Sequence, residues 1–408
     1  MSFAAFLKDA ESYLTKEDAF KIQPSSEFKK KYQMVKKLGN GAFAEVYLTQ
    51  EKETGELFAS KLIDRSQIAS PKHLWNEIHI LNSLDHPSII KLKDAYANKK
   101  FVTMVLEYAK GGELLEHIYS MQDYDENEAI RIIHDLLDAI NYLHQQRVVH
   151  RDIKPENILF ADEHSQFMKL SDFGLSSVLK ENSLLSTCAG TPGFMAPEVI
   201  KSNGYGFECD MWSVGVLAYF LLSGILPFNS NVPFKLYQSI LNAEYEFGPE
   251  FDDISEEAKD FITKCIRVKP KERLTAKEAL RHPWIDQFGI GQTIKTREII
   301  LEPDGPSDHK KLPAIRQRIL DYLNQRRKMK MYQATNMAIS FITKLKLKAN
   351  LAKKTISENK TDEPAIDNKT QTEQTTNNNN ENNKNQDQDI LSKDVIKISA
   401  SHTLYNKS

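Results

Sequence analysis

The apolar and polar positions follow two different periods along the chain. Between about residues 32 and 108, β-branched and aromatic runs at 47–48, 58–63 and 101–106 alternate with turn residues, which predicts strands. One stretch with helical spacing, at 72–84, interrupts them. From 110 to about 286 the apolar residues mostly recur with the period of a helix, as in the segments 129–143 and 211–222. We therefore expect a strand-rich region followed by a larger, mostly helical one.

Further segments flank this region. Residues 1–31 contain apolar residues at helical spacing before a Pro-Ser-Ser break, namely Phe3, Phe6, Leu7, Tyr13 and Leu14. After the helical region come a linker at 287–309, a basic segment at 310–354 and a tail at 355–408. The tail is rich in Asn, Gln and Thr and has few residues that offset the entropy of ordering, so we expect it to be disordered.

Composition narrows the class of protein. Of the 408 residues, 40% are hydrophobic and 27% are charged, as in globular proteins with additional solvated segments. No apolar run approaches the roughly 18–20 residues of a membrane-spanning helix, and the N-terminus lacks the features of a secretory signal. Three widely spaced cysteines argue against a disulfide framework or a zinc cluster. We expect an intracellular, cytoplasmic protein, with a nuclear location left open and membrane binding disfavoured.

The net charge of −2 conceals an uneven distribution. The segment 310–354 contains thirteen Lys or Arg residues and one acid, Asp321, so its charge is +12 and the other 363 residues carry −14. This asymmetry indicates that the basic segment has an acidic or anionic partner.

The first chemical motif is a glycine-rich hairpin between two predicted strands, with the sequence LGNGAFAEV at 38–46. Its two glycines would let backbone amides approach a phosphate, and Val46 could cover a base. Taken alone, the hairpin also fits an ordinary turn. No helix follows it, which argues against a dinucleotide-binding Rossmann turn.

A lysine follows this hairpin inside an apolar strand. Lys61 lies fifteen residues beyond Val46, and an unpaired ammonium group is costly to bury there. It therefore requires an anion, either a ligand phosphate or a carboxylate, and Glu77 on the following helix is the natural partner. The alternative is an edge-strand lysine in solvent.

Two polar loops in the helical region carry the remaining candidate groups. In the loop HRDIKPEN at 150–157, Asp152 can orient and accept a proton from a hydroxyl, while Lys154 can neutralise transferring charge. The amide oxygen of Asn157 can bind a hard cation. Twenty residues after Asp152, Asp172 in the sequence SDFG supplies a second oxygen ligand. The sequence Ala-Pro-Glu at 196–198 then closes a polar loop.

In this order and spacing, the motifs resemble those of the eukaryotic protein kinase family. The resemblance covers about residues 32–286 and includes the sequence DMWSVG at 210–215 and Arg273, the usual partner of the Ala-Pro-Glu carboxylate. It implies an α+β, bilobal fold: a small antiparallel-sheet N-lobe with one helix at 32–108, and a larger, mostly helical C-lobe at 109–286. It also implies an active enzyme, because every catalytic position is filled. The competing class is an inactive kinase fold that serves as a binding scaffold.

The resemblance assigns roles to individual residues. Asp152 would be the catalytic base, Lys154 would steady the γ-phosphate, and Lys61 would hold the α- and β-phosphates of ATP. Asn157 and Asp172 would hold Mg²⁺, for which Mn²⁺ can substitute. The nucleotide and its support would involve Leu38, Gly39, Asn40, Gly41, Ala42, Phe43, Ala44, Val46, Ala59, Glu77, Leu106, Glu107, Ala109, Glu113, Glu156 and Leu159.

The segments 190–198 and 221–228 are similar to those of calcium/calmodulin-dependent and calcium-dependent protein kinases, and Lys154 is typical of serine/threonine kinases. No EF-hand loop occurs in the sequence, so an external calcium sensor is expected. Arg151 would bind a phosphate on the activation loop, which we define as residues 181–192. Thr187 is the main candidate for this modification by an upstream kinase. An unmodified polar loop is the alternative.

The basic segment then gains a candidate role. Its part at 326–351 combines apolar residues at helical spacing with many Lys and Arg residues. Such a helix can dock on its own kinase domain, bind calcium–calmodulin or a related sensor, lie on anionic lipid, or simply be solvated. We expect an autoinhibitory or calmodulin-binding role, protein substrates and no nucleic-acid partner, since no aromatic-rich surface accompanies the charge. Truncation near residue 300 would then raise basal activity.

Overall fold

The computed structural model divides the chain into two units, residues 1–320 with 403–408, and residues 321–402. It describes the following residues: 22–40, 44–67, 71–121, 123–162, 167–179, 184–185, 191–202, 204–230, 232–286, 312 and 314–328. In the second unit the described residues, 321–328, are helical. Several predictions lie outside the described residues: those for Gly41, Ala42, Phe43, Thr187, the linker at 287–309, the basic segment beyond 328 and the tail at 355–408.

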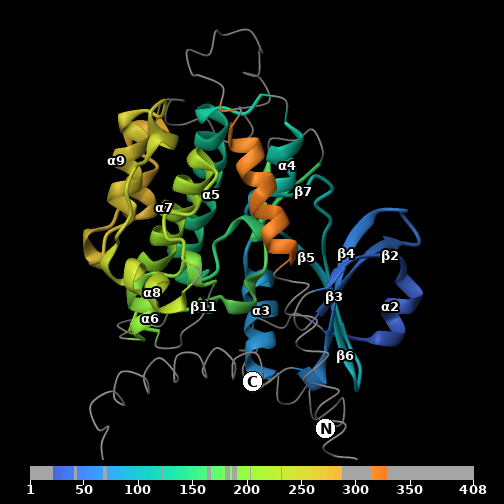
Figure 1. The fold of residues 1–408 in the computed structure, drawn as a ribbon. Helices are drawn as coiled ribbons and strands as arrows, with labels where there is room; N and C mark the ends of the chain where they lie inside the picture. The colour runs from blue at the N-terminus through green and yellow to red at the C-terminus, as the bar shows by residue number, and fades with distance from the viewer. Residues whose placement is uncertain are drawn as a thin grey trace, which may run out of the picture. The chain divides into compact units, whose positions relative to one another are not determined.

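A six-stranded sheet forms the first lobe (Figure 1). Its strand order is β1 (Gln23–Pro24), β5 (Leu92–Ala97), β6 (Phe101–Glu107), β4 (Leu57–Asp64), β3 (Ala44–Glu51) and β2 (Tyr32–Asn40). Neighbouring strands are antiparallel except β1 and β5, which are parallel. The runs predicted as strands at 47–48, 58–63 and 101–106 lie in β3, β4 and β6.

Two helices flank this sheet. One is α3 (Pro71–Ser83), close to the helix predicted at 72–84. The other, α2 (Ser25–Lys31), lies in the segment expected to precede the lobe, and the sheet itself already begins at Gln23. Phe28 of α2 joins a buried cluster with Tyr32, Phe58, Tyr96 and Val105. Side chains alternate across a strand, so Phe58 and the cluster lie on the face of β4 opposite to Lys61.

The second lobe is mostly helical, as the kinase resemblance implied. Its centre is α7 (Glu208–Ser223), in which every residue from Cys209 onward is buried. Beside it lies α5 (Glu126–Gln145), whose apolar stripe is buried and whose first turn is capped by the Asp125 carboxylate. The other described helices of this lobe are α4 (Leu114–Ser120), α6 (Pro197–Lys201), α8 (Pro233–Asn242), α9 (Glu256–Cys265), α10 (Ala276–Ala279), α11 (Pro283–Asp286) and residues 314–320.

Short strands frame the loops that carry the candidate chemistry. Strands β10 (Met168–Leu170), β9 (Ile158–Phe160) and β7 (Gly112–Glu113) form one small sheet, and β11 (Ser177–Val178) pairs with β8 (Val148–Val149). The loop at 150–157 runs from β8 to β9, and the Asp-Phe-Gly sequence lies between β10 and β11. Among the described residues, no helix is both long and apolar enough to cross a membrane.

Candidate active site

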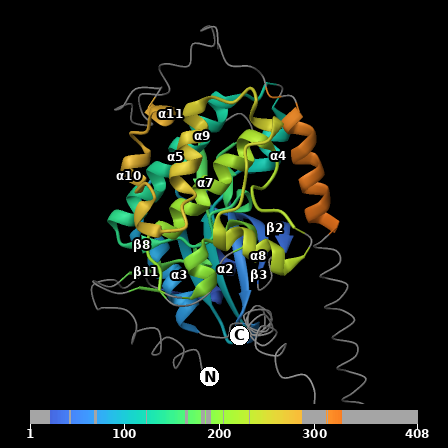
Figure 2. The same cartoon turned by 60° about the vertical axis from the view of Figure 1, so that its left-hand side comes forward.

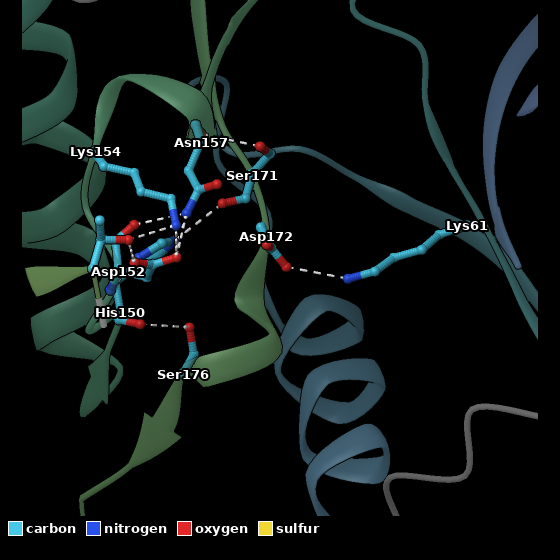
Figure 3. Close-up of polar contacts among 9 residues, drawn as sticks. Lys61, His150, Asp152, Lys154, Asn157, Ser171, Asp172 and Ser176 are labelled. Atoms are coloured by element: carbon cyan, nitrogen blue, oxygen red, sulfur yellow. Dashed lines mark hydrogen bonds and ion pairs between the residues drawn. The ribbon is translucent and has the colours of Figure 1, made fainter. Parts of the chain in front are cut away.

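Lys61 lies between two carboxylates. Its Nζ is 2.7 Å from Oε1 of Glu77 on α3 and 3.1 Å from Oδ1 of Asp172, the contact drawn in Figure 3. The Glu77 side chain is 7% exposed and that of Asp172 is 50% exposed, so the Asp172 side of the group is accessible to a ligand. Strand β4 is an interior strand of its sheet. Lys61 is therefore a paired lysine and not the solvent-facing edge residue that the sequence also allowed.

The charges of this group reinforce one another. Burial opposes the charged form of Lys61, but the attraction of Asp172 and Glu77 outweighs it and raises the lysine pKa. The Lys61 charge lowers the pKa of Asp172 to about 2, against the effect of burial. Burial raises the pKa of Glu77 above its ordinary value. At neutral pH the group therefore presents an ammonium and an ionised Asp172, the chemistry that phosphate and metal binding require.

A second group surrounds Asp152. Lys154 Nζ donates to Asp152 Oδ2 at 2.5 Å and to Thr191 Oγ1 at 2.8 Å. The Thr191 hydroxyl donates to Asp152 Oδ1 at 2.9 Å. Asn157 Nδ2 donates to the Asp152 carbonyl at 2.7 Å and to Oδ2 at 3.0 Å. Donors thus orient both carboxylate oxygens, and the fixed amide of Asn157 leaves its oxygen as the candidate metal ligand.

Ser171 joins the two groups. Its N–H and hydroxyl donate to the Asn157 carbonyl at 2.8 and 3.0 Å. The next residue, Asp172, has left-handed backbone angles, φ 61° and ψ 76°, and its side chain points to Lys61 (Figure 3). A Cβ added to Gly174 would lie 3.3 Å from Asp172 Oδ1 and 3.5 Å from Glu77 Oε2, so Gly174 packs directly against both carboxylates. The structure therefore brings Lys61, Asp152, Asn157 and Asp172 into one site.

Asp210 of α7 supports the loop from beneath. It accepts hydrogen bonds from the backbone N–H groups of His150 at 3.0 Å and Arg151 at 2.9 Å, and its Oδ2 is 2.9 Å from Nε2 of His144. Burial opposes the charged form of Asp210, yet these partners lower its pKa. Arg151 has a φ of 71°, a left-handed conformation that costs a non-glycine residue about 1–2 kcal/mol. The carboxylate therefore stabilises the backbone conformation of the catalytic loop.

Asp210 and His144 were not among the predicted site residues. The available signals were the kinase-like sequence DMWSVG at 210–215 and an acid within a mostly apolar helix, because a buried carboxylate requires donors. The sequence pattern does not identify those donors, which come from the end of α5 and from the loop at 150–157.

The predicted nucleotide-contacting residues lie on the elements around these groups. Six of these residues form three pairs across neighbouring strands: Gly39 with Val46, Ala59 with Leu106, and Glu113 with Leu159. Glu107 ends β6, and its carboxylate is 2.7 Å from Nζ of Lys169. The remaining described positions lie on the hairpin, just beyond β6 and in the turn after Lys154: Leu38, Asn40, Ala44, Ala109 and Glu156.

Leu185 of the activation loop is held near Arg151. Leu185 forms an antiparallel bridge with Tyr205 through two backbone hydrogen bonds of 2.9 Å. The Tyr205 hydroxyl accepts a hydrogen bond from Arg151 Nη1 at 3.2 Å. Thr187, the predicted phosphorylation site, lies two residues beyond this bridge and outside the described residues.

A buried ion pair fixes α6, which follows the activation loop. Arg273 donates to the two Glu198 oxygens at 2.6 and 2.7 Å. The arginine side chain is fully buried, and its guanidinium lies 5.1 Å from the centre of the Trp212 ring. The pair implied by the kinase resemblance is therefore present.

Residues 312–320 pack on the second lobe beside α4 (Figure 2). Arg316 donates to the Tyr119 carbonyl at 3.0 Å, and Arg318 donates to the Ser223 carbonyl at 2.8 Å. These carbonyls belong to the last turns of α4 and α7, where no donor within the helix is available. The two arginines therefore supply hydrogen bonds that the helix ends lack.

Apolar contacts accompany these hydrogen bonds. Ile315 and Ile319 are 2% and 0% exposed. The Leu312 N–H donates to the Tyr124 carbonyl at 3.0 Å. A Cβ added to Gly224, whose φ is +76°, would lie 2.7 Å from the Arg318 Cβ. This close approach requires glycine at the end of α7.

Sequence comparison agrees with this fold and site. The family model described as the protein kinase domain matches residues 32–285, and the chain belongs to the protein kinase family. Calcium/calmodulin-dependent protein kinase type 1 of Caenorhabditis elegans is 41% identical over 281 residues, which cover 68% of this chain and 79% of the relative. Myosin light chain kinase A of Dictyostelium discoideum is 38% identical over 284 residues, which cover 68% and 96%. The corresponding type 1 kinase of Macrobrachium nipponense is 43% identical over 260 residues, or 62% and 75%.

The protein is therefore a serine/threonine protein kinase similar to the calcium/calmodulin-dependent kinases. It uses ATP and a divalent metal to phosphorylate protein substrates. The predicted class of enzyme and the predicted bilobal α+β fold are confirmed.

Proposed function

We propose that the site transfers the γ-phosphoryl group of Mg²⁺-bound ATP to protein hydroxyls, with Asp152 as the base and Lys61 as the phosphate clamp. The observation that carries this proposal is the joining of the Lys61–Asp172 pair to the Asp152–Asn157 pair through Ser171. Asp152 would orient the substrate hydroxyl and accept its proton. Lys154, bonded to both Asp152 and Thr191, would neutralise charge on the transferring group.

The donor set fits Mg²⁺. Asp172 is ionised at neutral pH because Lys61 lowers its pKa to about 2, and Asn157 adds an amide oxygen. In the described part of the chain, no group of three or more His, Cys, Asp or Glu side chains could hold a metal alone. One carboxylate and one amide are a donor set that Mg²⁺ completes with phosphate oxygens and water. The ion, when bound, would neutralise phosphate charge.

A phosphotransfer assay on the full chain tests these roles. The substrate is a basic serine peptide, ATP carries a radiolabel, and Mg²⁺, Mn²⁺ and Ca²⁺ are compared. Asp152→Asn should lower kcat by about 10²–10⁴-fold, the contribution of general base catalysis, while the protein stays folded. Asp138→Asn is the matched control, because Asp138 is 42% exposed on α5. Equal rates for Asp152→Asn and the parent enzyme would refute the assigned base.

We also propose that phosphorylation of Thr187 by an upstream kinase orders the activation loop through Arg151. The Leu185–Tyr205 bridge supports this proposal, because it holds the chain near the Arg151 guanidinium two residues before Thr187. A phosphate would add charge-assisted hydrogen bonds to that arginine. Thr187→Ala should abolish activation by an upstream kinase, whereas Ser183→Ala, in the same loop, should not. Equal activation of both variants would contradict the assignment.

The C-terminal segment is the second regulatory element that we propose. Residues 312–320 would anchor it on the C-lobe, and the basic part at 326–351 would inhibit the kinase until an acidic calcium sensor of the calmodulin type removes it. The arginine contacts at the ends of α4 and α7 support the anchor. The relatives from Caenorhabditis elegans and Macrobrachium nipponense are named calcium/calmodulin-dependent kinases, which supports calmodulin as the class of sensor.

The anchor changes how a truncation should be designed. Burial of Ile315 and Ile319 contributes about 1.5–3 kcal/mol per side chain, so a cut near residue 300 would also destabilise the C-lobe. A cut after residue 328 keeps the anchor and removes the rest of the segment. We expect the enzyme ending at 328 to match the activity of the full chain with calcium–calmodulin. If calcium–calmodulin leaves the activity of the full chain unchanged, the proposed sensor is wrong.

Glycine substitutions test the anchor itself. Gly224→Ala should detach residues 312–320, because the new Cβ would meet Arg318. Gly55→Ala is the matched control for backbone strain, since Gly55 has the same φ of +76° but its nearest neighbour is a flexible glutamine side chain at 3.7 Å. We expect greater protease sensitivity at 312–320 in the first variant alone. Equal sensitivity in both variants would contradict the anchor.

A further inference from the structure

The face of the N-lobe sheet away from the active site contains a cavity of about 560 Å³. It is walled by α2 and by strands that include β2, β4 and β6, and its large apolar side chains are Phe28, Met34, Leu62 and Phe101. Leu62 follows Lys61 on β4, so the two side chains point to opposite faces of the sheet. The kinase site therefore does not use this cavity. The cavity is open to solvent at Met34, which lines it and is 36% exposed.

The charged residues at the cavity have one sign. Lys29 and Lys52 line it, and none of the described residues that line it is acidic. Lys52 Nζ donates to the Lys29 carbonyl at 2.6 Å, so both lysines lie on the same rim. An apolar floor with a basic rim fits an amphipathic segment whose polar face is acidic.

We propose that the segment 1–20 of this chain lies over this face and that its apolar centre, at Phe6 and Leu7, occupies the cavity. This segment has two lysines and four acidic residues, Asp9, Glu11, Glu17 and Asp18, for a charge of −2. Its apolar residues recur at helical spacing, with Phe6 and Leu7 at their centre. Charge and apolar pattern therefore both complement the cavity.

The chain enters at the right place. Ile22 is buried, β1 pairs with β5 at the edge of the sheet, and Ser25 lines the cavity. Six strands spaced about 4.8 Å apart span about 24 Å, and 20 helical residues extend about 30 Å. The segment is therefore long enough to cross the face from β1 to β2.

The other segments of the chain fit less well. The basic segment at 310–354 carries +12 and would be repelled by Lys29 and Lys52. The tail at 355–408 is dominated by polar residues in its central part and offers little apolar surface.

Photo-crosslinking in the full-length protein tests this proposal. Met34 is replaced by p-benzoylphenylalanine, and Val35 is replaced in a control protein. Val35 is the neighbouring residue, is 53% exposed and does not line the cavity. Isotopically light and heavy chains are mixed so that mass spectrometry distinguishes crosslinks within one chain from those between chains. We expect position 34 to crosslink with residues 1–20 of the same chain, at least about 10-fold more than position 35.

Substitutions on both sides then test the complementarity. Phe6→Asp and the pair Lys29→Glu with Lys52→Glu should each reduce the crosslink several-fold. Lys36→Glu, a charge change on β2 away from the cavity, should leave it unchanged. Crosslinks between chains, crosslinks to residues 329–408, equal yields at positions 34 and 35, or insensitivity to Phe6→Asp would each overturn the proposal. None of these measurements depends on kinase activity.

Discussion

Replacing Asp210 by alanine tests how the C-lobe holds the catalytic loop. The Asp210 side chain is 1% exposed and accepts from two backbone N–H groups, those of His150 and Arg151. Alanine would leave both donors buried without their acceptor and would remove the partner of His144. Arg151 would then lose the contact that offsets its left-handed backbone.

The expected loss of stability follows from these contacts. An unsatisfied buried donor costs about 1–3 kcal/mol, and two donors are affected. Alanine also removes the cost of burying the Asp210 charge, because burial alone disfavours the carboxylate. This gain offsets part of the loss in the free energy of unfolding. We therefore expect a decrease of about 2–5 kcal/mol in the free energy of unfolding. At about 2–4 °C per kcal/mol for a domain of this size, the Tm should fall by roughly 4–20 °C.

Differential scanning calorimetry measures the Tm of each protein. A kinase assay, run below the Tm of the least stable variant, measures kcat. Asp210→Asn keeps one acceptor oxygen and should fall between the alanine variant and the parent. Asp138→Ala removes a half-exposed carboxylate on α5 and should cost less than about 1 kcal/mol. If Asp210→Ala changes both Tm and kcat no more than Asp138→Ala, the loop does not depend on this carboxylate.

Three further predictions concern other charged residues. Lys61→Met should reduce kcat/KM for ATP by at least about 100-fold. It should also lower the Tm, because the buried Glu77 carboxylate loses its partner. Initial rates and calorimetry measure the two effects, and unchanged ATP dependence would exclude the phosphate clamp. Arg273→Leu should leave Glu198 buried without a partner and lower the free energy of unfolding by about 3–5 kcal/mol in urea titrations; a loss below about 1 kcal/mol would mean that the pair is solvated. The folded pKa of Asp172, about 2, lies below its ordinary value of 3.8, so the stability from its contact with Lys61 is present above about pH 4 and lost as the pH falls toward 2. The urea midpoints of the parent and Asp172→Asn should therefore differ by a constant amount from about pH 5 to 8 and converge below 4; convergence already near pH 6 would contradict the lowered pKa.

The strand and helix pattern could be predicted where the period is strong. The runs that became β3, β4 and β6 and the helices α5 and α7 each bury a continuous apolar face or core, so the period identifies them. Residues 25–31 had no such signal, since Phe28 is the one buried residue of α2 among three lysines and a glutamate. Its place depends on Tyr96, which is distant in sequence.

The same limit applies around the site. Motif spacing brought Lys61, Asp152 and Asp172 together as candidates because the chemistry requires them at one ligand. The role of Asp210 depends instead on backbone donors, which no residue type reveals. The anchor at 312–320 was missed for a similar reason: its two arginines bind carbonyl groups, and carbonyl groups are the same in every sequence.

Because β1 pairs with β5, the folded N-lobe begins before the first residue of the kinase family match. The kinase family match begins at residue 32, yet residues 23–24 complete the edge of the sheet and Phe28 covers Tyr96 and Tyr32. A fragment that started at residue 32 would expose an open strand edge next to an uncovered aromatic hollow. Such a surface favours aggregation, so recombinant enzyme should be produced from residue 22 or earlier.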